Sequence, residues 1–137
     1  MESTAQLSDL QFAVMRVIWS RGEATVVDVH TALQRERGLA MTTVATVLSR
    51  LEKRGLVKHR SAGRQYVYQA TVTESQVRRS MIRDLTERLF EGDVTELVHH
   101  LLSERDISAG DLETVKRLIE EKERKGPGPG KDSQDDG

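Results

Sequence analysis

Cysteine is absent from the 137-residue sequence, and aromatic residues make up only 4% of it. The first absence excludes disulfide bonds, thiol nucleophiles, thiolate zinc sites and iron–sulfur clusters, and the second means that the core must be mostly aliphatic. No apolar run approaches the ~20 residues that cross a bilayer. The N-terminus also lacks the basic start and the apolar stretch of a signal peptide. We therefore expect a cytoplasmic protein without membrane insertion.

The residue patterns of common catalytic and metal sites are also missing. The sequence contains no nucleophile beside a base, no phosphate-binding loop and no paired carboxylates. None of the four histidines has metal-ligand spacing, because the adjacent His99 and His100 point to different sides of a helix. We interpret His30 and His59 as surface or packing residues. We expect neither an enzyme nor a bound metal or cofactor.

The charges nearly cancel over the whole chain but are unevenly distributed along it. The formal net charge is -1. Residues 1–72 carry ten basic and six acidic side chains, a net charge of +4, whereas residues 73–137 carry 11 basic and 16 acidic ones, a net charge of −5. A basic segment joined to an acidic one predicts two parts with different functions.

Helical periodicity predicts two helices at the start of the basic segment. The first runs from Leu7 to Ser20 with Ser8 as its N-cap. The second follows Thr25, which can serve as its N-cap, and ends near Arg37, before a glycine.

A third predicted helix runs from Thr42 or Thr43 to Arg54, with Gly55 as its C-cap. Its apolar residues are spaced i, i+3, i+4 and i+7, which indicates a single buried face. They are Val44, Val47, Leu48 and Leu51.

The period then changes to that of β-strands. Residues 56–60 and 64–69 are short β-favouring runs on either side of Ser61-Ala62-Gly63, and they predict a hairpin. Three helices followed by a two-stranded hairpin within about 70 residues is the order of a winged helix-turn-helix domain. We expect this domain to span residues 1–72.

From Thr73 onward the pattern is helical again. Thr73 and Gln76 resemble a capping box, and Gly92 interrupts the first of these helices. Further helices are expected over residues 94–103 and 108–125. The last residues, 126–137 (GPGPGKDSQDDG), cannot form a core and are expected to be a flexible tail.

The C-terminal helices are too short to form a good core alone, so pairing with a second copy would bury their apolar faces. We therefore expect a mainly α fold with a small β-hairpin, in which a helical dimerisation domain over residues 73–125 makes the protein a homodimer. The alternative is that these helices pack back on the winged domain of their own chain. The candidate interface residues are Leu85, Leu89, Phe90, Leu97, Val98, Leu101, Leu102, Leu112, Val115, Leu118 and Ile119.

The outward face of the third predicted helix combines short hydroxyl groups with long cations, and its only acid is Glu52. Short side chains let a helix approach DNA closely, and a guanidinium can then reach a base edge or a phosphate. The hairpin adds Lys58, Arg60 and Arg64, which would lie on the DNA backbone. The alternative is a solvated polar face beside an ordinary hairpin. The outward residues of the helix are Thr42, Thr43, Ala45, Thr46, Ser49, Arg50 and Lys53.

Four stretches form a recognisable order along the chain: LSDLQFAVMRVIW, VVDVHTAL, MTTVATVLSRLEKRGLVKHR and YVYQATVTESQ, of which TTVATVLSRLEKRGLV is the most specific part. This order resembles the BlaI/MecI/CopY family of penicillinase-type repressors. A weaker match extends it to about residue 124. The resemblance implies a homodimeric, cytoplasmic transcriptional repressor that binds palindromic double-stranded operator DNA through two winged helices.

The resemblance also implies which helix residues meet DNA. They are Thr43, Ala45, Thr46 and Arg50, with Arg50 and Thr46 as the leading contacts and Thr43 touching a phosphate. The family often carries a long basic side chain at the position of Ala45, so direct base reading here falls to fewer groups.

Relatives that respond to β-lactams are switched off by proteolysis at an Asn-Phe bond in the first part of the dimerisation region. The matching bond here is His100-Leu101. Cleavage there would separate the dimer contacts from the DNA-binding domain and lower operator occupancy. The resemblance thus implies a membrane sensor protease as a partner and cell-wall antibiotic stress as the signal. Copper-responsive members carry a cysteine-containing tail, which this sequence lacks.

Two other functions stay open from the residues alone. One is a winged-helix protein–protein interaction module, in which the hairpin and the third helix hold another protein. The cationic face argues against it. The other is a regulator that senses a small molecule directly at the dimer interface, although the C-terminal apolar positions contain no polar cluster to anchor a ligand.

Overall fold

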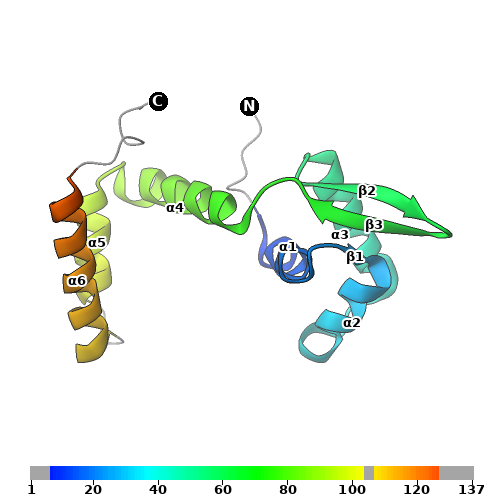
Figure 1. Ribbon diagram of the computed structural model, residues 1–137, viewed down its shortest axis with the longest axis horizontal. Helices are drawn as coiled ribbons and strands as arrows, with labels where there is room; N and C mark the ends of the chain where they lie inside the picture. Colours follow the sequence, from blue (N-terminus) through cyan, green and yellow to red (C-terminus); the bar gives the residue numbers. More distant parts are fainter. Residues whose placement is uncertain (1–6, 104–106, 127–137) are drawn as a thin grey trace. The chain divides into compact units, whose positions relative to one another are not determined.

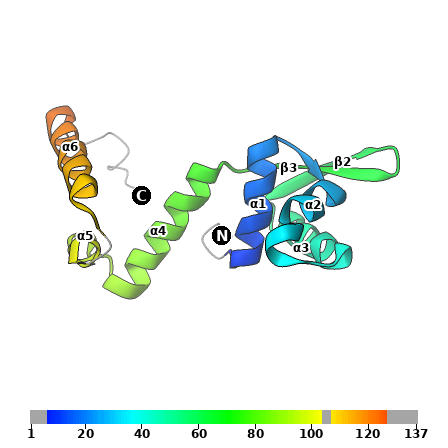
Figure 2. The same ribbon diagram turned by 90° about the horizontal axis from the view of Figure 1, so that it is seen from below.

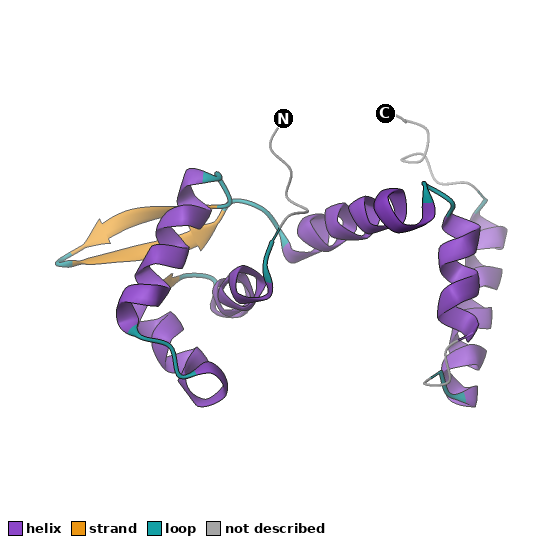
Figure 3. Cartoon of the chain, turned by 180° about the vertical axis from the view of Figure 1, so that it is seen from behind, coloured by secondary structure: helices purple, strands orange, loops and turns teal. Residues whose placement is uncertain are grey.

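The computed structural model describes residues 7–103 and 107–126. The chain divides into two compact units, one ending at Gly92 and one beginning at Asp93. Helices make up most of both units, and a small antiparallel sheet belongs to the first (Figures 1 and 3). The expected mainly α fold with a small β-hairpin is confirmed.

Helices α1 (Asp9–Arg21) and α2 (Val26–Arg37) begin at the N-caps that the sequence predicts. The Ser8 hydroxyl accepts a hydrogen bond from the N–H of Gln11, whose side chain accepts one from the N–H of Ser8. Thr25 and Asp28 form the same reciprocal pair at the start of α2. These capping boxes satisfy amide groups that the first helical turn would leave without partners.

Helix α3 spans Met41–Lys53 and therefore begins one or two residues before the predicted start. The reason is that the Ala40 carbonyl already accepts hydrogen bonds from the N–H groups of Thr43 and Val44. At the other end Arg54 occupies the C-cap position, and Gly55 follows it with a φ of 81°. The prediction of Gly55 as the C-cap was wrong by one residue.

The sheet has three strands, β1 (Ala24–Thr25), β2 (Val57–Ala62) and β3 (Gln65–Ala70), in the antiparallel order β1-β3-β2. The predicted hairpin is confirmed, but the sequence did not reveal the third strand, β1. Ala62 pairs with Gln65, so the turn is Gly63-Arg64, and Arg64 lies in the turn instead of in a strand. Gly63 has a φ of 65°, a left-handed conformation that favours glycine in such two-residue turns.

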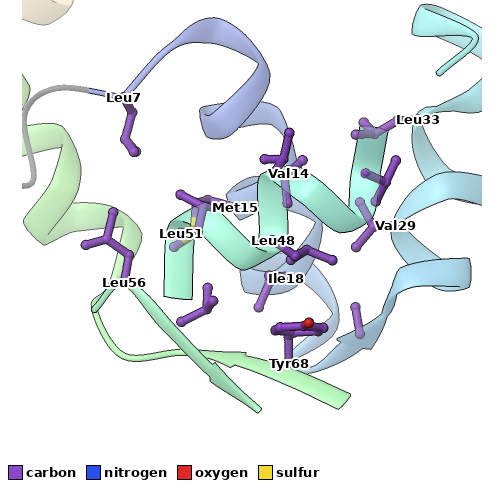
Figure 4. Packing of buried hydrophobic residues seen from close by; sticks show 14 of the residues in the cluster. Leu7, Val14, Met15, Ile18, Val29, Leu33, Leu48, Leu51, Leu56 and Tyr68 are labelled. Atoms are coloured by element: carbon purple, nitrogen blue, oxygen red, sulfur yellow. The ribbon is translucent and has the colours of Figure 1, made fainter. Parts of the chain in front are cut away.

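One aliphatic core joins the three helices to the base of the sheet (Figure 4). All four apolar residues predicted for the inner face of α3 are buried in it. Beyond Val57 every residue of β2 is exposed, so the hairpin extends away from this core, as Figure 2 shows. The core residues labelled in Figure 4 are Leu7, Val14, Met15, Ile18, Val29, Leu33, Leu48, Leu51, Leu56 and Tyr68. Three helices and a projecting hairpin form a winged helix-turn-helix.

Helix α4 (Glu74–Phe90) follows the sheet and starts with the predicted capping box of Thr73 and Gln76. Its first turns are attached to the winged domain. Val77 is fully buried, Met81 packs against the core, and the indole N–H of Trp19 donates to the carbonyl of Val72 at 2.9 Å. The helix ends where the chain turns left-handed at Glu91 and Gly92.

The second unit contains α5 (Val94–Ser103) and α6 (Ala109–Lys125), close to the predicted bounds. The Ser108 hydroxyl caps α6 by accepting from the N–H of Asp111. Neither helix buries a residue. Over the described residues, no helix is both long and apolar enough to cross a membrane.

Candidate nucleic-acid interface

The outer face of α3 is polar, open and cationic. Its predicted contact residues are all exposed except Thr43, which is half-buried. Arg50 and Lys53 extend from the last turns of the helix and form no ion pair with any residue that the structure describes. Because no carboxylate in the described part of the chain pairs with them, both cations can bind an external anion.

The N-terminus of α3 differs from those of α1, α2, α4 and α6, which all begin with a capping box. Its N-cap is Ala40, whose side chain cannot accept a hydrogen bond, and its first turn contains no acid. No side chain of the N-cap residue therefore accepts a hydrogen bond from the first amides of this helix. Helix N-terminal amides with their positive dipole are well suited to a phosphate oxygen.

The hairpin, which we call the wing (residues 57–70), carries the other predicted cations. Lys58, Arg60 and Arg64 are all exposed, and Arg64 lies at the tip of the wing. Lys58 and Arg64 form no ion pair among the described residues. Every residue of β2 after Val57 is exposed, so Lys58 and Arg60 lie at the protein surface.

Arg60 is held by an acid that the sequence did not point to. Its Nη2 lies 3.1 Å from both carboxylate oxygens of Glu23, which directly precedes β1. The two side chains are 55% and 45% exposed, so this is a surface ion pair that solvent screens strongly. Glu23 therefore competes with a phosphate for Nη2 of Arg60.

A second acid links α3 to the wing. Both carboxylate oxygens of Glu52 lie 2.8 Å from Nδ1 of His59 on β2. The His59 ring stacks on Tyr66 of β3, with 3.9 Å between ring centroids and 17° between the planes. This chain of contacts positions the wing relative to the end of α3, and it gives His59 a larger role than the surface or packing role expected from the sequence.

Tyr68 lies beneath this chain of contacts, at the point where the wing enters the core. Burial raises the pKa of its hydroxyl, and the nearby Glu52 carboxylate and Tyr66 raise it further. Its ring lies 5.6 Å from that of His59 and 6.4 Å from that of Tyr66. Tyr68 thus stays neutral and anchors the aromatic side of the wing.

The sequence did not identify Glu23, His59 or Tyr66 as part of this surface, and it placed Glu52 on the outer face of the helix without revealing its partner. The partners in the Glu23–Arg60 pair are 37 residues apart, and those in the Glu52–His59 pair are seven apart on different elements. Helical or strand periodicity carries no signal for either pair. The alternation of Tyr66 and Tyr68 on one face of a strand was the single hint available.

The residues predicted for a dimer interface lie on α4, α5 and α6. Phe90, Leu97 and Val115 are half-buried, and all the others are exposed. His100 and Leu101 lie inside α5, and both are exposed. Residues 127–137, most of the predicted tail, lie outside the described residues. Within residues 7–103 and 107–126, no group of three or more histidine, aspartate or glutamate side chains could hold a metal ion.

A protein-family model and individual known proteins both match this chain over most of its length. The model of the penicillinase repressor family matches residues 7–121. The methicillin resistance regulatory protein MecI of Mammaliicoccus sciuri is 22% identical over 119 residues, which cover 87% of this chain and 97% of the relative. The penicillinase repressor of Bacillus licheniformis is 28% identical over 121 residues, which cover 88% and 94% of the two chains.

One of the similar solved structures is the solution structure of monomeric Bacillus licheniformis BlaI in complex with the blaP half-operator. It is 33% identical, with a TM-score of 0.47, and the match covers 55% of this chain and 92% of that one.

Proposed function

Because this chain belongs to the penicillinase repressor family, we propose that it is a transcriptional repressor that binds double-stranded operator DNA through its winged helix-turn-helix. The observation that carries the proposal is the outer face of α3. It presents hydroxyl groups and two cations without protein partners among the described residues, beside a wing with three more cations. Such a surface matches one element in the major groove and another on the phosphate backbone.

In this proposal α3 enters the major groove. Arg50 and Thr46 read base edges, and Thr42, Ser49 and Lys53 support them from the same face. Thr43 lies at the start of the helix, where uncapped amides can hold a phosphate. Ala45 allows the helix to approach closely but reads no base by hydrogen bonding.

The wing supplies backbone contacts through Lys58, Arg60 and Arg64. Phosphate contacts release counterions, so each of them should make operator binding more sensitive to salt. The stack of His59 on Tyr66 and its contact with Glu52 hold the wing beside α3, which keeps the two sets of contacts in register on the DNA.

A gel shift with the DNA upstream of its own gene tests the proposal. Arg50→Ala should weaken sequence-specific binding by about 1–3 kcal/mol, the usual contribution of a bidentate base contact. Arg35→Ala is the matched control, because Arg35 is also an exposed arginine, on α2, and lies outside the proposed interface. Failure to bind any neighbouring promoter at moderate salt would contradict the proposal and favour a protein–protein module instead.

We further propose that the repressor is a homodimer. The winged domain of residues 1–72 would read one half-site, and the helices of residues 73–125 would join two copies. The support is the apolar surface of α5 and α6, where Val98, Leu101 and Ile119 among others face solvent in the single chain. A two-fold dimer would place its half-sites about 10 base pairs, or a multiple of that, apart.

Relief of repression by proteolysis at His100-Leu101 in response to β-lactams is the final part of the proposal. The bond lies in α5 between two exposed residues, so local opening of this helix would deliver it to a protease. Cells exposed to a β-lactam should then contain a shortened chain on a blot. A chain that stays full-length while its target genes are induced would exclude this route, with a sensor protease as partner, and leave repression itself intact.

A further inference from the structure

The first part of α3, residues 41–49, carries a restricted set of side chains. In a helix-turn-helix the N-terminal residues of the second helix lie against the base edges. Residues 41–49 (MTTVATVLS) include no asparagine, glutamine, arginine, lysine, aspartate or glutamate. Those are the side chains that hydrogen-bond two atoms of a purine or accept a hydrogen bond from cytosine. The part of α3 that would lie closest to the bases therefore lacks the groups for either kind of base recognition.

The outer face of this stretch presents methyl groups instead. Met41 is 42% exposed, although it is apolar. Ala45 is exposed one helical turn further along, and the two side chains lie on the same face because they are four residues apart. Thr46 is exposed next to Ala45 and carries a γ-methyl group together with its hydroxyl. These three residues, which we call the methyl strip, lie within the surface proposed to bind DNA.

Packing inside the winged domain does not account for the methyl strip. The four inner residues of α3 are fully or almost fully buried, whereas Met41 belongs neither to the core of the described residues nor to the apolar residues packed against it. A single exposed apolar side chain is common on protein surfaces. Here, however, the exposed methyl groups are placed where the helix would meet the bases, and no longer polar side chain accompanies them before Arg50.

We propose that the methyl strip recognises thymine methyl groups in the major groove of the operator. Thymine is the one base of DNA that presents an apolar group at this edge, its C5-methyl, and alanine and threonine methyl groups are common contacts of it. The unbranched, flexible side chain of Met41 can adapt to the same surface. Contact between the methyl groups removes apolar area from water and so favours thymine over cytosine at these positions.

This recognition rests on the proposed function and names the base that its recognition helix selects. Helix geometry also limits where the thymines lie. Met41 and Thr46 are about 7.5 Å apart along the helix axis, and successive base pairs are about 3.4 Å apart. The thymines that contact the methyl strip should therefore fall within about three consecutive base pairs of each half-site.

Deoxyuridine isolates these methyl groups, because it pairs with adenine as thymidine does and lacks only the C5-methyl. Footprinting first narrows the DNA upstream of the chain's own gene to the bound segment. Operators in which single thymines are replaced by deoxyuridine are then titrated with the full chain, with fluorescence anisotropy as the readout. We expect binding to weaken about threefold for each contacted thymine. Binding that no single replacement weakens would overturn the proposal, as would sensitive positions scattered across the whole segment.

Two pairs of variants assign the effect to the methyl strip. The quantity compared is the uracil penalty, the ratio of the dissociation constants for the operators with and without deoxyuridine at the sensitive positions. Thr46→Ser removes a methyl group and keeps the hydroxyl, so the penalty should fall about threefold, whereas Thr46→Val keeps a methyl group and should retain the penalty. Met41→Ala should also lower it. Val27→Ala, at a 46% exposed position on α2, should not.

An equal uracil penalty in all four variants would overturn the proposal, because the methyl groups would then act through the shape and stiffness of the DNA. Two further outcomes separate the proposal from the proposed function. A protein that binds the thymine and deoxyuridine operators with equal affinity still binds DNA, so recognition of methyl groups alone would be excluded. A protein that binds neither operator would contradict the proposed function, together with the base recognition that rests on it.

Discussion

At the scale of single residues, acids near the wing oppose the cations that would bind DNA. Glu23 holds Arg60 through two contacts of 3.1 Å on the protein surface. An incoming phosphate would compete with this carboxylate for Nη2 of Arg60 and would also approach its negative charge. The pair therefore acts against binding, although Arg60 is one of the predicted contacts.

Replacing Glu23 should thus strengthen operator binding. Glu23→Gln leaves Arg60 free for phosphate, and the affinity should rise about threefold, in keeping with the small free energy of exposed ion pairs. Fluorescence anisotropy with labelled operator measures the change. Arg60→Ala should weaken binding, and in that background Glu23→Gln should have a much smaller effect.

A decrease in affinity for Glu23→Gln would have a different meaning. Glu23 would then orient Arg60 toward the DNA instead of competing with it. The double variant separates the two roles, because coupling between neighbouring side chains appears as a departure from additivity.

At the scale of elements, the N-terminus of α3 combines poor capping with an exposed position. Ala40 has the extended conformation of an N-cap, with φ −73° and ψ 152°, but lacks a side chain that can accept a hydrogen bond. A serine there should stabilise the protein by about 1 kcal/mol. The sequence keeps an alanine, which leaves the amides open to a phosphate.

Two substitutions at this position separate stability from DNA binding. Ala40→Ser and Ala40→Asp should both raise the free energy of unfolding in urea by about 1 kcal/mol. Only Ala40→Asp should weaken operator binding, because its carboxylate would occupy the place of the phosphate and repel it. If both variants bind operator equally well, the start of α3 does not contact the backbone.

The capping box of α2 makes the stability of the winged domain depend on pH. The Thr25 backbone N–H donates to the Asp28 carboxylate at 3.0 Å and holds the pKa of that carboxyl below its usual value. Burial acts in the opposite direction, while the Thr25 hydroxyl and the Arg21 guanidinium at 3.5 Å lower the pKa further. The folded state therefore binds this proton less readily than the unfolded state does.

The sign of the pH effect follows from that lowered pKa. The contribution of Asp28 is fully present above its unfolded pKa and is lost as pH falls through the lower folded value. Urea unfolding should show Asp28→Asn less stable than wild type near pH 6, with the difference shrinking toward about pH 3. Glu113→Gln, which changes an exposed carboxylate on α6, should show no such convergence.

How far the sequence predicts these elements depends on the range of the interactions that define them. The starts of α1, α2 and α4 are set by hydroxyl groups that bond three residues ahead, so Ser8, Thr25 and Thr73 could be read directly. Strand β1 has only two residues, and Ala24 pairs with Tyr68 far along the chain. No periodicity can develop in so short a strand, and its partner is set by the tertiary fold.

The candidate site also contains residues that the sequence could predict and contacts that it could not, and the reason is again the range of the interactions. The outer face of α3 was predictable because burying one face of an amphipathic helix fixes which residues lie on the other. The contacts made by Glu23 and Glu52 were not, since each depends on where the hairpin lies relative to another element. The DNA contacts of Arg50 and its neighbours stay predictions, which the gel shift tests.

At the scale of the whole molecule, the near-neutral net charge is the sum of a basic part, residues 1–72, which contains the proposed DNA-binding surface, and an acidic part, residues 73–137. A net of +4 over residues 1–72 is small for a DNA-binding protein, and the acidic remainder further weakens non-specific attraction to DNA. A single copy should therefore bind weakly. In the proposed homodimer two DNA-binding domains would act on two half-sites at once, so we expect high affinity to depend on dimerisation.

The apolar face of α6 supplies the last prediction. Leu118→Gln with Ile119→Gln removes two exposed apolar side chains, each worth about 1.5–3 kcal/mol when buried. The dimer dissociation constant from sedimentation equilibrium should rise at least about a hundredfold. Binding to DNA with two half-sites should weaken in parallel, while binding to one half-site stays unchanged.

The control is Glu113→Gln with Glu120→Gln, which introduces two glutamines on the opposite face of α6. It should leave the dimer dissociation constant and the affinity for DNA with two half-sites unaltered. A dimer that survives the first pair of changes must use another surface.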